Sequence, residues 1–423
     1  VFSLEQFGVK LGLDSIRSLC AALGNPQRAY RTVIVAGTNG KGSVTAMVER
    51  ALRAAGHRSA RYISPHLFRL EERFAIAGED ISSHDLELAA AKVVDTIHGL
   101  LERGTLGVPP TFFEATTAIA FQAFCDAHAE IAVLEVGLGG RLDATNIAEP
   151  LAVAITSIDR DHEQQLGHTL REIAFEKAGV IKPKRPAVVG PLDAEARREV
   201  LRVAAERAAV AIDALDGVAS RVSGNSTALS LELTTPVRQY PGVALALAGR
   251  HQVTNAIVAV RLLEALESQG IPVGPEAILQ GLSDVRWPGR LEWIDVRGGT
   301  LLLDAAHNPA GAESLAAYLG ELASPLPLVF GAVKGKDVHG MLEVLLPRVS
   351  RVIATEAPTP RAERSEEIAL NIRAVNPAMP LAIEPDPLRA VTAALAECGR
   401  AVVAGSIFLI GDVRGRLLVP ESA

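Results

Sequence analysis

One short stretch near the start of the chain restricts the possible folds more than any other. The apolar run TVIV at positions 32–35 leads into the glycine-rich sequence GTNGKGS at positions 37–43, and a helical pattern follows to position 52. In a strand, turn and helix of this kind, backbone N–H groups and the positive end of the helix dipole point to one place, which favours a bound phosphate. The stretch therefore predicts a phosphate loop in which Lys41 reaches the terminal phosphates.

The match to the strict P-loop pattern is partial. That pattern has a glycine five residues before Gly40, where this chain has Val35. The alternative is an ordinary turn that uses glycine for its positive φ. The strand before the turn and the helix after it favour phosphate binding, and the loop residues expected to contact the nucleotide are Thr38, Asn39, Gly40, Lys41, Gly42 and Ser43.

Length and composition narrow the class of protein. With 423 residues the chain is long for one hydrophobic core, so we expect two domains, 1–287 and 288–423. Charged residues make up 22% and hydrophobic residues 48%, which is typical of globular proteins. The net charge of −7 gives no basic field for nucleic acid, and no apolar run approaches the length that spans a membrane. The three cysteines are far apart in the sequence, which favours a reducing cytoplasm over disulfides or a zinc site.

Polar side chains follow two of the next predicted strands. Ser64 and His66 come after a strand at 59–63, and His162 comes after a strand at 151–157. Because the carboxyl ends of parallel strands meet at one edge of a sheet, these residues are candidates for the same site as the phosphate loop. The alternative for Ser64 and His66 is a turn beside a proline, and for His162 it is a structural histidine.

A carboxylate ends a third strand. Glu135 belongs to the apolar strand at 131–136 and precedes the glycine-rich sequence GLGGRLDATN. A bare charge is costly to bury, so Glu135 must be paired or must bind a cation. Beside a triphosphate it would be a Mg²⁺ ligand, whereas the alternative is a salt bridge to Arg141.

Two adjacent aromatic residues, Phe112 and Phe113, are unusual in a chain with 4% aromatic residues. Thr111 and Glu114 have the spacing of a capping box, which predicts the start of a helix. A second interpretation is a ligand site, in which Phe112 or Phe113 stacks on a flat ring and Glu114 binds its polar edge.

A second α/β series begins after Trp287. Strand-like runs at 301–303, 328–330, 352–354 and 401–404 each lead into polar residues, as in a doubly wound sheet. This half has no phosphate loop of its own. The expected fold is therefore α/β, with an N-terminal P-loop ATPase-type parallel-sheet domain and a C-terminal Rossmann-like α/β domain that faces it across a cleft.

Six motifs occur in order along the chain: GTNGKGS, SPHL, EVGLGGRLDATN, EKAG, PGR and DAAHNP. Together they resemble the folylpolyglutamate synthase/dihydrofolate synthase family, which belongs to the Mur ligase superfamily of ATP-dependent amide-forming enzymes. The resemblance extends from position 11 to position 406, and the motif at 135–146 is its most specific part.

The resemblance implies a site for ATP and Mg²⁺. It assigns the magnesium ligands to Ser64, Glu135 and His162. Nucleotide contacts outside the phosphate loop would be Asn255, Arg290 and Asp304, with His307 close by. Lys177, in EKAG, matches a lysine that family members carry as a carbamate, an anion able to support the metal site. The implied catalytic residues are Lys41, Lys177, His162 and Arg290.

The resemblance also implies a pterin pocket, although these motifs match more loosely. The pocket residues would be Leu11, Gly12, Leu13, Asp14, Thr111, Phe112, Phe113, Glu114, Leu142, Asp143 and Ala144. Two positions depart from the family pattern: Phe112 stands where tyrosine is common, and Glu163 follows His162 where the family often has threonine. These departures concern the acceptor pocket rather than the ATP chemistry.

The expected activity is ATP-dependent ligation of L-glutamate to dihydropteroate, to the γ-carboxylate of folates, or to both, through an acyl phosphate. The alternatives are a folylpolyglutamate synthase without the first activity, another Mur-type amide ligase, and a nucleotide-switched regulatory module. By analogy with the family we expect a cytoplasmic monomer with small-molecule substrates and no nucleic-acid or membrane partner.

Overall fold

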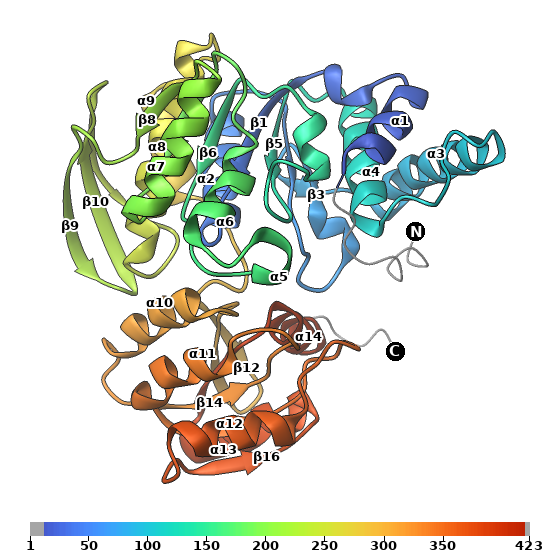
Figure 1. Cartoon of the computed structure of the whole chain (residues 1–423). Helices are drawn as coiled ribbons and strands as arrows, with labels where there is room; N and C mark the ends of the chain where they lie inside the picture. The colour runs from blue at the N-terminus through green and yellow to red at the C-terminus, as the bar shows by residue number, and fades with distance from the viewer. Residues whose placement is uncertain (1–11, 419–423) are drawn as a thin grey trace.

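The larger part of the molecule is built on an eight-stranded sheet. The structure, a computed structural model, describes residues 12–418 (Figure 1). The strand order of this sheet is β4-β3-β2-β5-β1-β6-β7-β8. Strands from β2 to β8 in this order are parallel, and β3 and β4 form an antiparallel edge. The strands are β1 (Arg31–Ala36), β2 (Ser59–Tyr62), β3 (Phe74–Ile76), β4 (Glu79–Asp80), β5 (Ile131–Glu135), β6 (Ala152–Ile155), β7 (Pro186–Val189) and β8 (Val210–Asp213).

Helices cover both faces of this sheet, which is why its central strand is apolar on both sides. In β1, Ile34 and Ala36 face one hydrophobic cluster, whereas Val33 and Val35 face another. The helices of the first cluster are α1 (Asp14–Ala22), α3 (Ser83–Glu102), α4 (Phe112–Asp126), α6 (Leu170–Ala178) and α7 (Ala194–Glu206). The second cluster contains α2 (Lys41–Ala54), α8 (His251–Ser268) and α9 (Pro275–Ser283).

Short elements complete this part. A three-stranded antiparallel sheet has the order β11-β10-β9, and its Leu229, Leu231 and Leu233 pack on the cluster of α2, α8 and α9. Its strands are β9 (Ala219–Asn225), β10 (Ala228–Thr234) and β11 (Gln239–Ala244). The remaining short helices are η2 (Pro26–Arg28), η3 (Leu70–Arg73), η4 (Ala144–Ile147) and α5 (Glu163–Leu166).

The smaller part is a six-stranded sheet with the order β12-β13-β17-β14-β15-β16. It is parallel except for β12, which pairs antiparallel with β13 at one edge. Its strands are β12 (Glu292–Val296), β13 (Gly299–Leu303), β14 (Leu326–Phe330), β15 (Val349–Ala354), β16 (Leu381–Ile383) and β17 (Arg400–Ala404). Its helices are α10 (Pro309–Leu319), α11 (Val338–Leu345), η5 (Leu346–Arg348), α12 (Ser365–Val375), α13 (Pro387–Cys398) and α14 (Ile407–Leu418).

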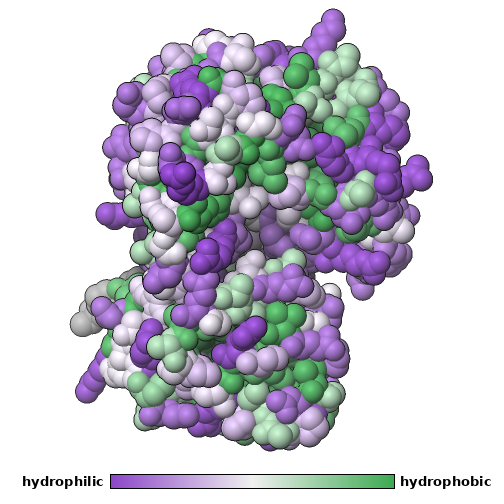
Figure 2. Space-filling model, turned by 90° about the vertical axis from the view of Figure 1, so that its left-hand side faces the viewer, coloured by the Kyte–Doolittle hydropathy of each residue, from purple (hydrophilic) through white to green (hydrophobic). Residues whose placement is uncertain are grey.

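The expected α/β class with two largely parallel sheets is confirmed. The two parts lie one against the other and meet at a narrow waist (Figure 2). Within residues 12–418, no helix combines the length and the apolar character needed to cross a lipid bilayer.

Candidate active site

The phosphate loop lies between the end of β1 and the first residue of α2. Gly40 has φ 83°, a left-handed conformation that favours glycine, and a Cβ there would overlap the side-chain oxygen of Asn255. The Thr38 N–H donates to the Ser157 carbonyl at 2.8 Å. The Lys41 ammonium donates to the Gly37 and Thr38 carbonyls at 3.1 and 2.9 Å, so it lies within the curve of the loop.

A second lysine reaches the same loop from α6. The Lys177 Nζ donates to the Gly37 carbonyl at 2.7 Å, and the side chain is 5% exposed. Burial and the neighbouring Lys41 lower the pKa of Lys177 from its ordinary value near 10.5 to about 7. Burial also lowers the pKa of Lys41. Lys177 therefore carries a neutral amine in a large fraction of molecules at neutral pH.

Glu135 ends β5 beside the loop that carries Ser64. The Ser64 N–H donates to the Glu135 carboxylate, and the Ser64 hydroxyl is buried without a hydrogen-bond partner in the described chain. Burial raises the pKa of Glu135, whereas Lys41 and Arg290 act to lower it. Arg141, the alternative partner of Glu135, pairs instead with Glu176, with 2.8 Å between Nη2 and Oε1. The salt-bridge alternative from the sequence is therefore wrong.

His162 stands at the start of α5 with a strained backbone. Its φ of 55° and ψ of 37° place a non-glycine residue in the left-handed region, which is costly and is common at functional sites. Burial and Lys336 lower the pKa of His162 to about 4, so the ring is neutral at neutral pH and keeps a free lone pair. No set of three or more His, Cys, Asp or Glu side chains in residues 12–418 is arranged to hold a metal on its own.

The smaller part contributes Arg290, Asp304 and His307 to the same region. Burial lowers the pKa of Arg290, while Asp304 and Glu135 act to raise it, so this cation faces carboxylates from both parts. The Asp304 carboxylate accepts the N–H groups of Leu291 and Ala306 at 2.9 Å each, and burial raises its pKa. The His307 Nδ1 lies 3.0 Å from the Ala305 carbonyl.

Asn255 is connected to Ser43 of the phosphate loop through Gln252, which like Asn255 belongs to α8. The Asn255 Nδ2 donates to the side-chain oxygen Oε1 of Gln252 at 2.9 Å, and the Gln252 Nε2 donates to the Ser43 hydroxyl at 3.2 Å. A Cβ on Gly42 would lie 2.6 Å from the Trp287 ring. These contacts bring α8 and the connection between the two parts directly onto the phosphate loop.

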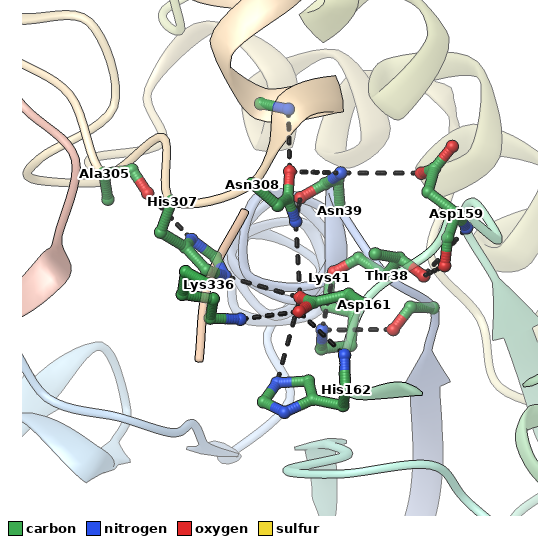
Figure 3. Close-up of polar contacts among 12 residues, drawn as sticks. Thr38, Asn39, Lys41, Asp159, Asp161, His162, Ala305, His307, Asn308 and Lys336 are labelled. Atoms are coloured by element: carbon green, nitrogen blue, oxygen red, sulfur yellow. Dashed lines mark hydrogen bonds and ion pairs between the residues drawn. The ribbon is translucent and has the colours of Figure 1, made fainter. Parts of the chain in front are cut away.

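A polar network crosses from one part to the other (Figure 3). Asn39 of the phosphate loop and Asn308 exchange side-chain hydrogen bonds of 3.3 and 3.2 Å. Asp161 accepts from the Asn308 amide at 3.3 Å and from the Lys336 ammonium at 2.6 Å. Asp161, Asn308 and Lys336 are not among the site residues expected from the sequence. The available signals were the position of Asp161 directly before His162 and that of Lys336 shortly after β14.

The segments assigned to the pterin pocket come together in the described chain. Helix α1 packs on α4 and on η4, and Leu13 and Phe113 lie against the cluster that contains Ala144. The capping box is present: the Thr111 N–H donates to Glu114 Oε2 at 2.8 Å, and the Glu114 N–H donates to the Thr111 hydroxyl at 3.2 Å. The second carboxylate oxygen of Glu114, Oε1, is buried without a partner in the described chain.

Other predicted pocket residues have mainly structural contacts. The Asp143 carboxylate accepts the N–H groups of Gly137, Leu138 and Thr145 at 3.0 Å each, which orders its own loop. The Arg73 guanidinium lies over the Phe112 ring, with 5.2 Å between its Cζ and the ring centroid. Gly12 precedes α1, Asp14 is the first residue of α1, Leu142 is half-buried beside Asp143, and Leu11 is outside the described residues. His66, a candidate for the phosphate-loop site, accepts from the Arg73 Nε–H at 2.9 Å.

A recess of about 640 Å³ lies at the opposite edge of the sheet, where β1 and β5 begin. Arg31, His57 and Glu130 are among the residues that line it, and its lining includes none of the predicted site residues. Ligands of open parallel sheets bind at the carboxyl ends of the strands, so we place the active site at the phosphate loop and not in this recess.

Known proteins are similar to this chain in both sequence and fold. Two family models match: Mur ligase middle domain over residues 84–263 and Mur ligase, glutamate ligase domain over residues 289–407. A dihydrofolate synthase/folylpolyglutamate synthase of Bacillus subtilis is 33% identical over 421 residues, covering 97% of this chain and 96% of that protein. A probable bifunctional folylpolyglutamate synthase/dihydropteroate synthase of Haloferax volcanii is 35% identical, and this chain, matched over its whole length, spans 50% of it.

Solved structures agree with these relatives. Folylpolyglutamate synthase of Mycobacterium tuberculosis complexed with ADP has a TM-score of 0.91 and 31% identity, over 98% of this chain and 96% of that one. A bifunctional folylpolyglutamate synthase/dihydrofolate synthase with Mn, AMPPNP and L-glutamate bound has a TM-score of 0.84 and 31% identity, over the same shares of both chains. The chain therefore belongs to the folylpolyglutamate synthase/dihydrofolate synthase family of Mur ligases.

Proposed function

We propose that this chain is an ATP-dependent ligase that joins L-glutamate to dihydropteroate and to the γ-carboxylate of folates. The observation that carries the proposal is the convergence of Lys41, Glu135 and Arg290 at the phosphate loop. These side chains come from both parts of the molecule, as a reaction with several substrates requires. The alternative of a nucleotide-switched module would require only the phosphate loop. It would not explain why Arg290 and Asp304 are buried at the same site.

The first step is phosphorylation of the acceptor. The acceptor carboxylate attacks the γ-phosphorus of ATP, the bond from that phosphorus to the β–γ bridging oxygen breaks, and ADP leaves. The product is an acyl phosphate. Lys41 and Arg290 neutralise the phosphate charge while the loop N–H groups hold the phosphates in place, because phosphoryl transfer depends mainly on positioning and charge screening.

Magnesium fits the residues at this site. Ser64 offers a buried hydroxyl without a partner in the described chain, Glu135 offers a carboxylate, and His162 offers a neutral ring nitrogen. Hydroxyl and carboxylate oxygens are the hard donors that Mg²⁺ prefers. The ion would supply further screening of the phosphate charge, and these three side chains would hold it.

Lys177 has the chemistry required of a carbamate. Carbamylation needs a neutral amine, and burial beside Lys41 lowers the pKa of Lys177 to about 7, so that about half of the molecules carry the neutral amine at that pH. A carbamate would carry a negative charge next to the Lys41 ammonium, which replaces a repulsion with an attraction. The modification would therefore explain why Lys177 is buried next to Lys41.

The second step forms the amide. The amine of L-glutamate attacks the acyl carbon, phosphate leaves, and the amine gives up a proton to the surroundings. Water competes for the same acyl phosphate, so the site must exclude it. We assign the phosphate loop and most nucleotide contacts to a first domain, residues 1–287. Glutamate binding, together with the nucleotide contacts of Arg290 and Asp304, is assigned to a second domain, residues 288–423.

The acceptor pocket is assigned to the packed segments of α1, α4 and η4. A pterin ring would stack on Phe112 or Phe113, and the unpartnered Glu114 Oε1 would accept hydrogen bonds from the ring edge. By analogy with the family, the protein acts as a cytoplasmic monomer on small molecules. Size-exclusion chromatography with light scattering would test the oligomeric state.

The test is glutamate-dependent ADP release with Mg-ATP, with 7,8-dihydropteroate and tetrahydrofolate offered in separate reactions and the products identified by mass. Product from both acceptors supports a bifunctional enzyme and the pterin pocket. Product from tetrahydrofolate alone would leave a polyglutamylase with that pocket wrongly assigned. If folded protein used neither acceptor, the folate assignment would be abandoned.

A further inference from the structure

An ion pair joins the two parts of the molecule at the active site. The Lys336 Nζ lies 2.6 Å from Asp161 Oδ1, and the two side chains are only 11% and 10% exposed (Figure 3). Asp161 directly precedes His162 in the larger part, whereas Lys336 lies between β14 and α11 in the smaller part. Ion pairs shielded from water in this way depend strongly on both partners, because either charge alone would be buried unpaired.

The same carboxylate holds a second contact between the parts. The Asn308 Nδ2 donates to Asp161 Oδ2 at 3.3 Å, and the two Asn308–Asn39 hydrogen bonds continue the network into the phosphate loop. Asn308 is 3% exposed and caps α10, where its Oδ1 accepts the Gly311 N–H at 2.8 Å. Movement of Asp161 is therefore coupled to the phosphate loop and to the start of α10.

Lys336 supplies the cation that Asp161 needs. His162 and His307 also face this carboxylate, with Nε2 at 3.8 and 3.7 Å from Oδ2. Among the described side chains that face Asp161 with a nitrogen of an ion pair, Lys336 makes the shortest contact, with 2.6 Å between Nζ and Oδ1. A second ion pair between the parts, Arg250–Glu321, is 57% and 32% exposed and open to solvent screening.

We propose that Asp161 and Lys336 are positioning residues, and that their ion pair is the latch that holds the smaller part closed over the phosphate loop. Neither side chain has to touch the reacting atoms. The latch keeps Asn308 on Asn39 and keeps water away from the acyl phosphate. Its role in the reaction rests on the proposed ligase function, whereas its role in closure does not.

The test compares Lys336→Met with Lys334→Met, a matched control on an exposed lysine of the same loop. Small-angle scattering of the ligand-free proteins measures closure, and the ratio of ADP formed to amide formed measures escape of the acyl phosphate to water. Lys336→Met should have a larger radius of gyration than wild type and a ratio raised several-fold, with kcat lower by about 100-fold as expected for misplaced groups. Lys334→Met should match wild type in both.

Two further variants keep the test decisive. Lys336→Arg retains the charge and should recover most of the compact state. If Lys336→Met does not fold, Asp161→Asn takes its place in the measurement, and it should have a larger radius of gyration than wild type. An unchanged radius of gyration in folded Lys336→Met or Asp161→Asn would overturn the latch. If wild type made no amide, the ligase proposal would fail, but the scattering comparison would still decide whether the latch exists.

Discussion

The chemistry of this site depends on which side chains keep a charge inside the protein. Two lysines, Lys41 and Lys177, reach the carbonyl of Gly37, and both cannot be charged there without repulsion. The structure resolves the conflict by burying Lys177 until its pKa is about 7. His162 is neutral for a similar reason, because burial and Lys336 oppose its positive charge. The site thus holds an amine that is about half neutral at pH 7 and a neutral imidazole beside the two proposed phosphate-binding cations, Lys41 and Arg290.

The pKa of Lys177 predicts how its carbamylation depends on pH. An ordinary lysine is almost fully charged below pH 9, whereas the Lys177 amine is half neutral near pH 7 and increasingly neutral above it. At a fixed concentration of dissolved CO₂, the carbamate should therefore rise between pH 6 and pH 8. NMR of protein in ¹³C-labelled CO₂ would measure it, with Lys177→Arg as the control that lacks a reactive amine.

Loss of Lys177 should also remove ligation. Lys177→Ala is expected to reduce kcat by about 100-fold or more, since the metal site loses a supporting anion. Bicarbonate with a small carboxylate should restore part of the activity, because the free carboxylate can occupy the space that the side chain leaves. Full activity in the variant without any addition would exclude Lys177 from the mechanism.

At the scale of elements, the site is assembled from helix starts and loops that follow parallel strands. Helix α2 begins at the phosphate loop after β1, α5 begins after β6, and α4 begins at the capping box that faces the proposed pterin pocket. The smaller part contacts the loop that follows β2 through α14. Gly411 and Gly415 of that helix lie against Leu67 and Phe68, next to the loop residue Ser64.

The capping box allows a test that separates support of the helix from substrate binding. Glu114→Gln keeps an N3 residue that can accept from the Thr111 N–H, so its melting temperature should equal that of wild type. If Glu114 binds the pterin edge, loss of its charge should reduce kcat/KM for dihydropteroate by about tenfold or more, as expected for a hydrogen bond to a charged group. Thr111→Val is the structural control and should destabilise the protein by about 1 kcal/mol.

The contact of α14 with the Ser64 loop leaves no room for a side chain at Gly411. A Cβ there would overlap the Leu67 carbonyl oxygen, and the Leu67 side chain packs on the hydrophobic cluster of α13 and α14. Gly411→Ala should therefore cost about 1–3 kcal/mol of stability, as overpacking does, and should raise the Mg²⁺ concentration needed for activity by moving Ser64. Gly107→Ala, where a Cβ meets open space, is the control for thermal unfolding. Equal melting temperatures for the two variants would contradict this account.

Local sequence patterns were sufficient to predict those features that depend on neighbouring residues. The phosphate loop, the capping box at Thr111 and the buried Glu135 each follow from neighbouring residues, and the structure has the strand and helix starts where these patterns place them. Asp161 and Lys336 are different, because 175 positions separate them and the residues around each of them do not indicate that they pair. Their pairing depends on how two separately built sheets come together, which no periodicity or spacing within either half reports.

For the whole molecule, the central question is how two parts joined by a narrow waist shut out water during catalysis. Nucleotide-binding residues are proposed on both sides, with Lys41 and Asn255 on the larger part and Arg290 and Asp304 on the smaller one. Interfaces of this kind commonly open and close, since a few polar contacts contribute only modest free energy. A ligand that touches both sides adds its binding energy to the closed state and shifts the population towards it.

We therefore expect ATP to draw the two parts together. The Asp161–Lys336 ion pair already favours closure of the ligand-free protein, and a non-hydrolysable ATP analogue with acceptor should close the molecules that remain open. Wild-type protein should therefore show a small further decrease of its radius of gyration in small-angle scattering. Arg290→Met should bind the analogue more weakly and show less of this further compaction at saturation, because the remaining contacts lie mainly on the larger part. Lys336→Met should still compact when the analogue is bound, since the nucleotide replaces the lost ion pair as the link between the parts. No compaction of either wild type or Lys336→Met at saturating ligand would mean that the nucleotide does not drive closure.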